Sequence, residues 1–575
     1  MDTDEQLPPP NLAARIAVWA TKRGHGSTIG KPVIFLLLIL CWFSLTSLGA
    51  WQASPEPDVG RRLADALYAP FTFLAPQDSY LNQAESALLT DPLLWFGRFF
   101  GAAIPVYAIV WAAIAWGRRG LAHALLPLAR GHVILFSEPG EGDGIARRLT
   151  SDGEVVIHAE REPSPERIEA MGNLGIIVID AELPTALRRS NAEKASRLVV
   201  WGADDADNLA RALKIGELLT SRHEDILVRM ESAQMHRAMR LSRTILTRAD
   251  ARLRPLSLYQ AAVREVLADA DLTDAAHHFG QDAVNVGIIG HSRLLEEVAT
   301  FVLRHNWSVG LAPPRITIDP AYALHWERWF ELHRQAFDAY PQVLGRDAKP
   351  VSLASDHDAL INDPTLSRII LDLGDDGATV EEAFRIGLHR SREAALHYSI
   401  QPVTRSTHSV RALYREGEMH FEEPISLALQ RHAGSLMSRQ RDRAAARKHL
   451  AYEEGIPDEA DLPANKPWRH LDETYVHASR AAAEHDPIKK SDLARLSDSP
   501  AAQEKMRRNE HERWSVERLL DGWLPTADRD ATEPKRLLHR DLVPWEKLEA
   551  SDKEKDAAQV DALIAQTRKD ESQEI

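Results

Sequence analysis

Two long apolar runs near the N-terminus differ from the rest of the chain. Residues 33–50 (VIFLLLILCWFSLTSLGA) contain no charged side chain, and residues 93–116 contain only Arg98, close to one end. An uninterrupted apolar run of about 18 residues or more has the length that crosses the hydrocarbon core of a bilayer, and an arginine near its end can reach the interface. The pattern therefore predicts a membrane domain over 32–117 with two transmembrane helices, at about 33–50 and 93–116.

Basic residues lie on the same side of both predicted spans. They precede the first run and follow the second, as Arg15, Lys22, Arg23, Lys31, Arg118, Arg119 and Arg130. Cytoplasmic flanks of membrane helices carry an excess of lysine and arginine. We therefore expect a two-pass protein of the inner (plasma) membrane, in contact with the lipid bilayer, whose N-terminal segment 1–31 and C-terminus are both cytoplasmic.

After residue 131 the pattern changes to short apolar runs separated by amphipathic stretches. The first group is HVILF, EVVIHAE, LGIIVID, ASRLVVWG and DILVRM, between residues 132 and 230. A second group starts with AVNVGIIGHSRLLEEVATFVLRH at 283–305 and continues through RITID, KPVSL, SRIILDLG and ALHYSIQPV. Strands that alternate with helices at this spacing are typical of doubly wound parallel sheets. The pattern predicts two Rossmann-like α/β domains in tandem, over 131–250 and 281–405.

A glycine-rich turn follows the first predicted strand. Gly140, Gly142 and Gly144 lie between HVILF and the helical IARRL. Glycines at this point let the backbone approach a pyrophosphate and direct a helix N-terminus at it, although the spacing Gly-x-Gly-x-Gly departs from the usual Gly-x-Gly-x-x-Gly. Acidic residues inside the turn, Glu141 and Asp143, oppose an anion. Only two glycines, Gly287 and Gly290, are present at the corresponding turn of the second domain, for which we expect a structural role.

A carboxylate after the second strand, Glu160, is in position to accept hydrogen bonds from a ribose diol. A solvated loop acid is the alternative interpretation of this residue. Asp319 holds the matching position in the second domain and allows the same two interpretations.

Residues 132–232 resemble the nucleotide-binding domain of TrkA-N type potassium-transport regulators, also called RCK domains. The resemblance rests on the glycine turn, the acid after strand two, the segment Ile179-Asp180-Ala181 after strand three, and the group Asp204, Asp205 and Asn208 after strand four. It implies NAD(H) or another adenine nucleotide as the ligand, bound by Gly140, Gly142, Gly144, Glu160, Asp180 and Asp204. It also implies a homo-oligomer, a dimer or tetramer, involved in potassium or other cation transport.

The C-terminal part, over 440–565, is helical and highly charged. Residues 509–563 resemble the ryanodine-receptor (RyR) domain, on HERWSVERLLDGWLP followed by DLVPWEKLEASDKEKDAAQVDAL. The resemblance implies an all-α module. Trp514, Arg518 and Asp521 share one helical face, and such a set can stack on a small ligand and hydrogen-bond to it. The predicted ligand residues are Trp514, Glu517, Arg518, Asp521, Trp523 and Trp545; tryptophans buried in a core are the alternative.

Composition and missing motifs narrow the function. A net charge of −15 argues against a nucleic-acid partner, since phosphate binding needs a basic surface. The single cysteine, Cys41, excludes a disulfide framework. The sequence contains no Walker loop, His-Glu-x-x-His helix or Gly-x-Ser-x-Gly elbow, and we nominate no catalytic or metal-binding residue. We expect a membrane-anchored, ligand-sensing regulatory protein and not an enzyme; the alternatives are a membrane-tethered NAD(P)-dependent oxidoreductase and a non-catalytic scaffold.

Overall fold

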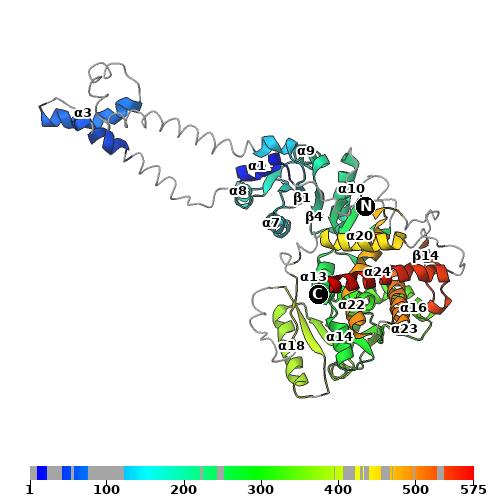
Figure 1. Ribbon diagram of the computed structural model, residues 1–575. Helices are drawn as coiled ribbons and strands as arrows, with labels where there is room; N and C mark the ends of the chain where they lie inside the picture. The colour runs from blue at the N-terminus through cyan, green and yellow to red at the C-terminus, as the bar shows by residue number, and fades with distance from the viewer. Residues whose placement is uncertain are drawn as a thin grey trace. The chain divides into compact units, whose positions relative to one another are not determined.

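Figure 1 shows the computed structural model of the 575-residue chain. It describes residues 10–21, 40, 42–48, 50–52, 57–74, 122–219, 225–241, 252–393, 395–405, 421–427, 432, 439–454, 466–468, 471–496, 499–526, 532 and 536–574. The chain divides into two compact units. Unit 1 holds Val133–Glu154 and Arg197–Ile575, and unit 2 holds Pro8–His132 and Val155–Ser196.

The first sheet has six strands in the order β3-β2-β1-β4-β5-β6. The strands are β1 (Val133–Ser137), β2 (Val156–Glu160), β3 (Ile177–Asp180), β4 (Arg197–Trp201), β5 (Asp225–Arg229) and β6 (Arg252–Leu256). In unit 1, β1 pairs with β4, β4 with β5 and β5 with β6, all parallel; in unit 2, β2 pairs with β3, also parallel. This strand order is that of doubly wound dinucleotide-binding folds, so the predicted fold of the first domain is confirmed.

The helices of the first domain follow its strands closely. They are α7 (Asp143–Ser151) and α10 (Asp205–Leu218) with α11 (Ala233–Leu241) in unit 1, and α8 (Pro165–Asn173) and α9 (Leu183–Arg189) with the 3₁₀ turn η2 (Ala192–Lys194) in unit 2. Unit 2 also contains α1 (Leu12–Thr21), α3 (Val59–Leu74) and the 3₁₀ turn η1 (Leu126–Leu128). Side-chain caps fix where two of these helices begin: Ser164 accepts from the Arg167 N–H, and Asp204 accepts from the Asp207 N–H.

The second sheet also has six strands, in the order β12-β11-β10-β7-β8-β9. These are β7 (Ala283–Gly290), β8 (Ala312–Ile318), β9 (Val351–Leu353), β10 (Arg368–Asp372), β11 (Ser399–Thr404) and β12 (Ile425–Ser426). The strand pairings are parallel. Its helices are α13 (Leu258–Leu267), α14 (Asp271–His278), α15 (Arg293–His305), the 3₁₀ turn η3 (Pro320–Tyr322), α16 (Ala323–Leu344), α17 (His357–Ile361) and α18 (Asp376–Arg390). The prediction of a second doubly wound domain is confirmed.

A close strand contact at the middle of the second sheet requires glycine. Gly290, the last residue of β7, has φ +104°, and a Cβ atom there would lie 2.0 Å from the carbonyl oxygen of Asp372 at the end of β10. A side chain at this position would force the two strand ends apart. This glycine therefore serves the packing of the sheet, in keeping with the structural role that we expected for the second turn.

The C-terminal module consists of α20 (Arg439–Glu454), α21 (Glu473–Glu484), α22 (Asp486–Arg495), α23 (Pro500–Leu520) and α24 (Ala550–Glu574), with the 3₁₀ turn η7 (Trp545–Lys547). The expectation of an all-α module is wrong in one respect, because β13 (Leu524–Pro525) and β14 (Leu538–His539) form a short parallel pair. Gly522, at φ +95°, ends α23 and turns the chain into an extended segment, where the Leu524 N–H bonds to the Leu537 carbonyl at 2.8 Å.

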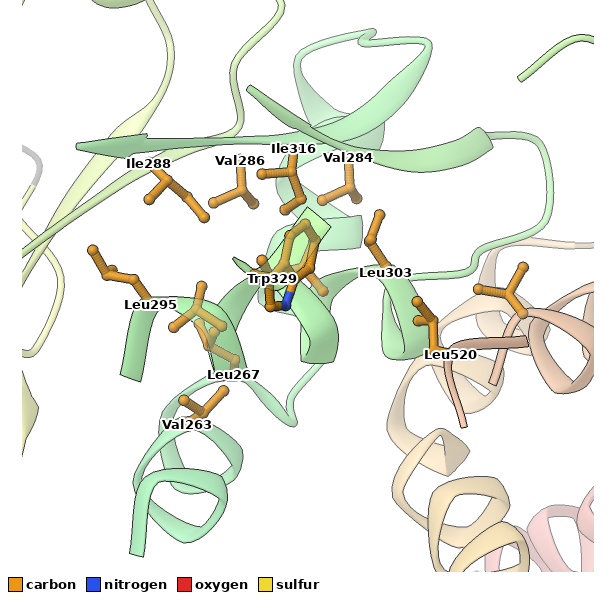
Figure 2. Packing of buried hydrophobic residues seen from close by; sticks show 14 of the residues in the cluster. Val263, Leu267, Val284, Val286, Ile288, Leu295, Leu303, Ile316, Trp329 and Leu520 are labelled. Atoms are coloured by element: carbon orange, nitrogen blue, oxygen red, sulfur yellow. The ribbon is translucent and has the colours of Figure 1, made fainter. Parts of the chain in front are cut away.

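The second sheet and the C-terminal module share one hydrophobic core. Val284, Val286 and Ile288 of β7 and Ile316 of β8 face Val263 and Leu267 of α13, Leu295 and Leu303 of α15 and Trp329 of α16 (Figure 2). Leu520, from the end of α23, belongs to the same cluster. Burial of such side chains contributes about 1.5–3 kcal/mol each. The helical module is thus joined to the second α/β domain by shared packing.

The predicted membrane spans fall mainly beyond the residues described. Residues 93–116 lie entirely outside them, and only part of 33–50 lies within them. Of the helices that are described, none combines the length and the apolar character needed to span a bilayer.

Candidate functional site

The glycine turn of the first domain lies in unit 1, between β1 and α7. Gly140 has φ +93°, a conformation that favours glycine, and a Cβ atom there would meet nothing within 4 Å. Gly142 is the N-cap of α7 and supplies no side-chain cap, and Gly144 lies in the first turn of the helix. A helix N-terminus without a side-chain cap presents backbone N–H groups that can bind an anion. The geometry thus suits the phosphate-binding role predicted for these glycines.

Two acidic side chains line the same turn. The Glu138 carboxylate accepts a hydrogen bond from Arg211 of α10. Glu141 Oε2 is buried without a hydrogen-bond partner among the described residues, and it lies 3.6 Å from where a Cβ of Gly202 would stand. An uncompensated carboxylate repels a phosphate. A phosphate at the turn would therefore bind more strongly if the Glu141 carboxylate moved away.

The loop after β4 is held by side-chain hydrogen bonds. Ser137 at the end of β1 is in register with Trp201 at the end of β4, so the glycine turn and this loop leave the same edge of the sheet. Asp204 caps α10 through the Asp207 N–H at 2.9 Å. Asn208 donates to the carbonyls of Gly202 and Arg229, at 2.9 and 3.1 Å. The carboxylate of Asp204 is thus engaged as a helix cap.

A second pair of carboxylates extends this network to α13. Asp205 accepts hydrogen bonds from the backbone N–H groups of Glu231 (3.0 Å) and Ser232 (2.6 Å). Glu231 accepts from Ser257 Oγ at 2.9 Å and from the Leu258 N–H at 3.1 Å. Ser257 is the N-cap of α13. The N-terminus of α10 is therefore connected to the N-terminus of α13 through the carboxylates of Asp205 and Glu231. Neither residue was predicted from the sequence as a ligand-binding residue.

The two remaining predicted nucleotide ligands lie in unit 2, where Glu160 of β2 is in register with Asp180 of β3. Glu160 is buried, and both its oxygens accept from Arg167, each at 2.5 Å. Hydrogen bonds from Arg167 and His158 outweigh the burial of the group and lower the pKa of Glu160 to about 2. Asp180 is exposed and accepts from the Glu162 N–H at 3.1 Å. Glu160 is thus a firmly ionised, arginine-paired carboxylate and not a solvated loop acid.

Two of the predicted ligand residues of the C-terminal module, Trp514 and Trp523, lie beside a third, Arg518. Its guanidinium lies 5.5, 5.8 and 5.6 Å from the ring centres of Tyr475, Trp514 and Trp523, and it donates to Thr474 Oγ1 at 3.2 Å. Arg518 and Trp523 are buried. This is cation–π packing inside the module. Trp545 makes other contacts, donating from Nε1 to Glu504 at 3.0 Å and lying beneath Lys553.

Carboxylates of the same module form an interior cluster with a histidine. His477 Nδ1 and one carboxylate oxygen each of Glu517 and Asp521 lie within 4.8 Å of one another, a donor set that suits a divalent cation. However, Arg513 pairs with Glu517 at 3.0 Å and Arg304 pairs with Asp521 at 2.7 Å. These guanidinium groups already balance the two carboxylates, and their charge opposes a cation.

Comparisons with known proteins give limited likenesses. No family model and no curated protein matches this chain. Among solved structures, the chain is similar to "GsuK bound to ADP" with 15% identity and a TM-score of 0.32, over 71% of this chain and 98% of that chain. It is similar to the "GsuK channel bound to NAD" with 12% identity and a TM-score of 0.34, over 73% and 86%. It is similar to the "GsuK RCK domain" with 13% identity and a TM-score of 0.31, over 56% of this chain and 78% of that chain. With all three TM-scores below 0.5, the proposals for this chain rest on its own contacts.

Proposed function

We propose that this protein is a ligand-sensing regulatory protein. In this proposal an adenine nucleotide binds at the carboxyl edge of the first sheet, and its presence is passed to α13 and the second α/β domain. The observation that carries the proposal is the hydrogen-bonded path from Asp205, in the first turn of α10, through Glu231 to the N-terminus of α13.

The binding half of the proposal rests on the turn between β1 and α7. Gly140 allows a backbone conformation that other residues rarely adopt, and Gly142 leaves the N-terminus of α7 without a side-chain cap. Arg211 of α10 contacts Glu138 in this turn. A nucleotide phosphate would compete with Glu138 for this guanidinium, because arginine pairs with phosphate and carboxylate in the same way. NAD(H) is the first nucleotide to test, since the RCK resemblance implies it.

A phosphate at this turn would regulate the protein by moving Arg211 and, with it, α10. Drawing Arg211 from Glu138 acts on α10, whose first turn holds Asp205 and, through it, the backbone of Glu231 and Ser232. A ligand shifts such an equilibrium only as far as it binds one arrangement more tightly than the other. Occupied and empty states would therefore differ in how firmly the N-terminus of α13 is held.

We further propose that the chain is anchored in a membrane by residues 33–50 and 93–116, with both termini cytoplasmic, and that it acts as a homo-oligomer on potassium or another cation. The length of the two apolar runs and their basic flanks support the anchoring. Two spans from a single chain cannot enclose a pore, so conduction would require several copies.

Binding is tested by titrating the full-length chain in detergent with NAD⁺, NADH and ADP by isothermal calorimetry. The informative variant is Glu141→Gln, which removes the negative charge of a half-buried side chain at the turn. Because a like charge near a phosphate is unfavourable, we expect at least about tenfold tighter binding, which corresponds to about 1.4 kcal/mol.

The matched control is Asp152→Asn, an exposed acid at the opposite end of the same helix. Its affinity should equal that of the unchanged chain. If neither the unchanged chain nor the Glu141→Gln variant binds any of the three nucleotides, the proposed function is wrong.

A further inference from the structure

A cleft opens in unit 1 between the second α/β domain and the C-terminal helices. Its volume is about 500 Å³, counted together with its open mouth. The α/β domain contributes residues of α13 and α15, and the helical module contributes residues of α20, α21 and α23. Arginines dominate the charged lining: Arg264, Arg304, Arg441 and Arg513, against Glu297 and Glu484. No residue of the first sheet takes part, so this cleft is separate from the glycine turn.

Two of these arginines share one carboxylate. Arg264 Nε lies 2.9 Å from Glu484 Oε1, and Arg441 Nε contacts the same oxygen. A guanidinium has five N–H donors in a planar fork that can engage two oxygens at once. Glu484 Oε1 can therefore accept hydrogen bonds from only some of the N–H groups of Arg264 and Arg441. The single negative charge of Glu484 balances one of the two positive charges of these arginines.

The carboxylate next to Arg441 in the chain is shared with two further arginines. Asp442, next to Arg441 in the chain, is already paired with Arg254 at 2.9 Å and with Arg480 at 2.8 Å. Burial and the nearby charge of Arg264 lower the pKa of Arg441 to about 9. Arg264, Arg441 and Arg480 thus lie together where α13, α20 and α21 meet, and they share the carboxylates of Glu484 and Asp442.

The remaining lining is ordered and partly aromatic. Arg513 is held by Glu510 and Glu517, and Arg304 by Asp521, so these two side chains are fixed in place. Arg304 Nε has no hydrogen-bond partner among the described residues. Phe301 stacks on His305 with ring centres 4.7 Å apart. Burial lowers the pKa of His305 to about 3, so this wall stays neutral at physiological pH.

We propose that this cleft binds the phosphate group of a small phosphorylated ligand, with Arg264 and Arg441 as its cations and Glu484 as the carboxylate that it displaces. A phosphate dianion supplies oxygens to both guanidinium forks and balances the charge that Glu484 leaves over. The two arginines come from α13 and α20. An occupied site therefore ties the second α/β domain to the helical module.

The phosphate can come from inorganic phosphate or from a phosphomonoester such as that of a nucleotide. The full-length chain is titrated with inorganic phosphate, AMP and adenosine, and binding is followed by calorimetry and ³¹P NMR. We expect inorganic phosphate or AMP to bind and adenosine not to bind. Binding of adenosine as tight as that of AMP would overturn the proposal, because no phosphate would then be involved.

Three variants separate this site from a purely structural cluster. Arg441→Gln should weaken phosphate or AMP binding by about tenfold or more, since it removes a charge-assisted contact. Glu484→Gln should strengthen binding, because the competing carboxylate is gone. Arg443→Gln, an exposed arginine on the same helix, is the matched control and should change nothing. If these side chains only held the fold together, the first two variants would either both leave the affinity unchanged or both lower it through damage to the fold, and either result would overturn the proposal.

Circular dichroism of each variant shows whether it folds. If Arg441→Gln does not fold, Arg441→Lys keeps the charge but loses the planar fork, and we expect weaker binding than in the unchanged chain. Unchanged affinity in Arg441→Lys together with unchanged affinity in Glu484→Gln would contradict the assignment. These variants leave the glycine turn intact, so failure here is distinguishable from failure of the nucleotide site on the first sheet.

Discussion

Glu231, two residues beyond β5, accepts a hydrogen bond from the backbone N–H of Leu258, the first residue of α13, at 3.1 Å. A side chain of the first α/β domain thereby holds the helix on which the second domain begins. The same carboxylate accepts from Ser257 Oγ and pairs with Arg229 at 3.2 Å. The two domains are thus connected by directed polar contacts at this point.

Removing the Glu231 carboxylate should weaken this connection. In Glu231→Ala the Leu258 N–H and Ser257 Oγ lose an acceptor, and hydrogen bonds to charged groups contribute about 1.5–3 kcal/mol each. We expect a lower thermal midpoint of the full-length chain, measured by calorimetry. Glu217→Ala, an exposed acid of α10 paired with Lys214, is the control and should lower it far less. Equal effects of the two substitutions would show that the contact adds nothing.

Gly290→Ala should destabilise the second sheet strongly. The new Cβ would lie 2.0 Å from the Asp372 carbonyl oxygen, and the backbone at φ +104° is itself unfavourable for alanine. Strain and overpacking of this kind cost about 2–5 kcal/mol together. Gly280→Ala shares a positive φ, +66°, but meets no atom within 4 Å, and should cost only about 1 kcal/mol. Urea denaturation of both variants measures the difference, and similar midpoints would contradict the close strand contact.

Because of Asp492, we expect the free energy of unfolding to fall as the pH rises. It accepts from Ser308 Oγ at 2.5 Å and from the Val309 N–H at 3.0 Å, and burial raises its pKa to about 6 from an ordinary value of 3.8. Between these two pKa values the folded chain keeps a proton on Asp492 that the unfolded chain releases. The stabilisation from this group is therefore complete below about pH 3.8, declines between pH 3.8 and 6, and is gone above about pH 6. In Asp492→Asn this part of the pH dependence should vanish, as denaturation between pH 4 and 7 would show. An unchanged pH profile would speak against it.

Because of His305, we expect the opposite change: the free energy of unfolding falls as the pH is lowered. Burial lowers its pKa to about 3, and the unfolded imidazole takes up a proton near 6.5 that the folded one refuses. Its contribution is therefore complete above about pH 6.5 and is lost as the pH falls toward 3. Replacement by glutamine should flatten the decline in stability between pH 6.5 and 4 in denaturation experiments. His278→Gln, on the neighbouring α14, is the comparison and should leave the decline as it is.

The sequence was sufficient for most strands and for the position of the turn. Continuous apolar runs such as HVILF and LGIIVID became β1 and β3, because a strand covered on both faces has no polar side to show. The edge strand β6 was missed, since its sequence RLRPL mixes arginines with a proline, and such a mixture is unlike the apolar runs of the other strands. The short β12 was missed as well.

Side-chain placement could not be predicted in the same way. Glu141 was identified as an acid in the turn, but its burial beside Gly202 depends on packing across β1 and β4. Arg518 was expected to face a ligand, whereas three aromatic rings of the module surround it. The cleft is lined by residues from five helices that are distant in sequence, and no local sequence pattern predicts such a site.

The central claim is that nucleotide at the β1–α7 turn changes how firmly α13 is held. Hydrogen–deuterium exchange of the full-length chain, with and without saturating NADH, measures this directly. We predict slower exchange in both α7 and α13 of the unchanged chain, and in α7 alone when Glu231 is replaced by alanine. NADH that binds but leaves the exchange of α13 unchanged in the unaltered chain would contradict the account.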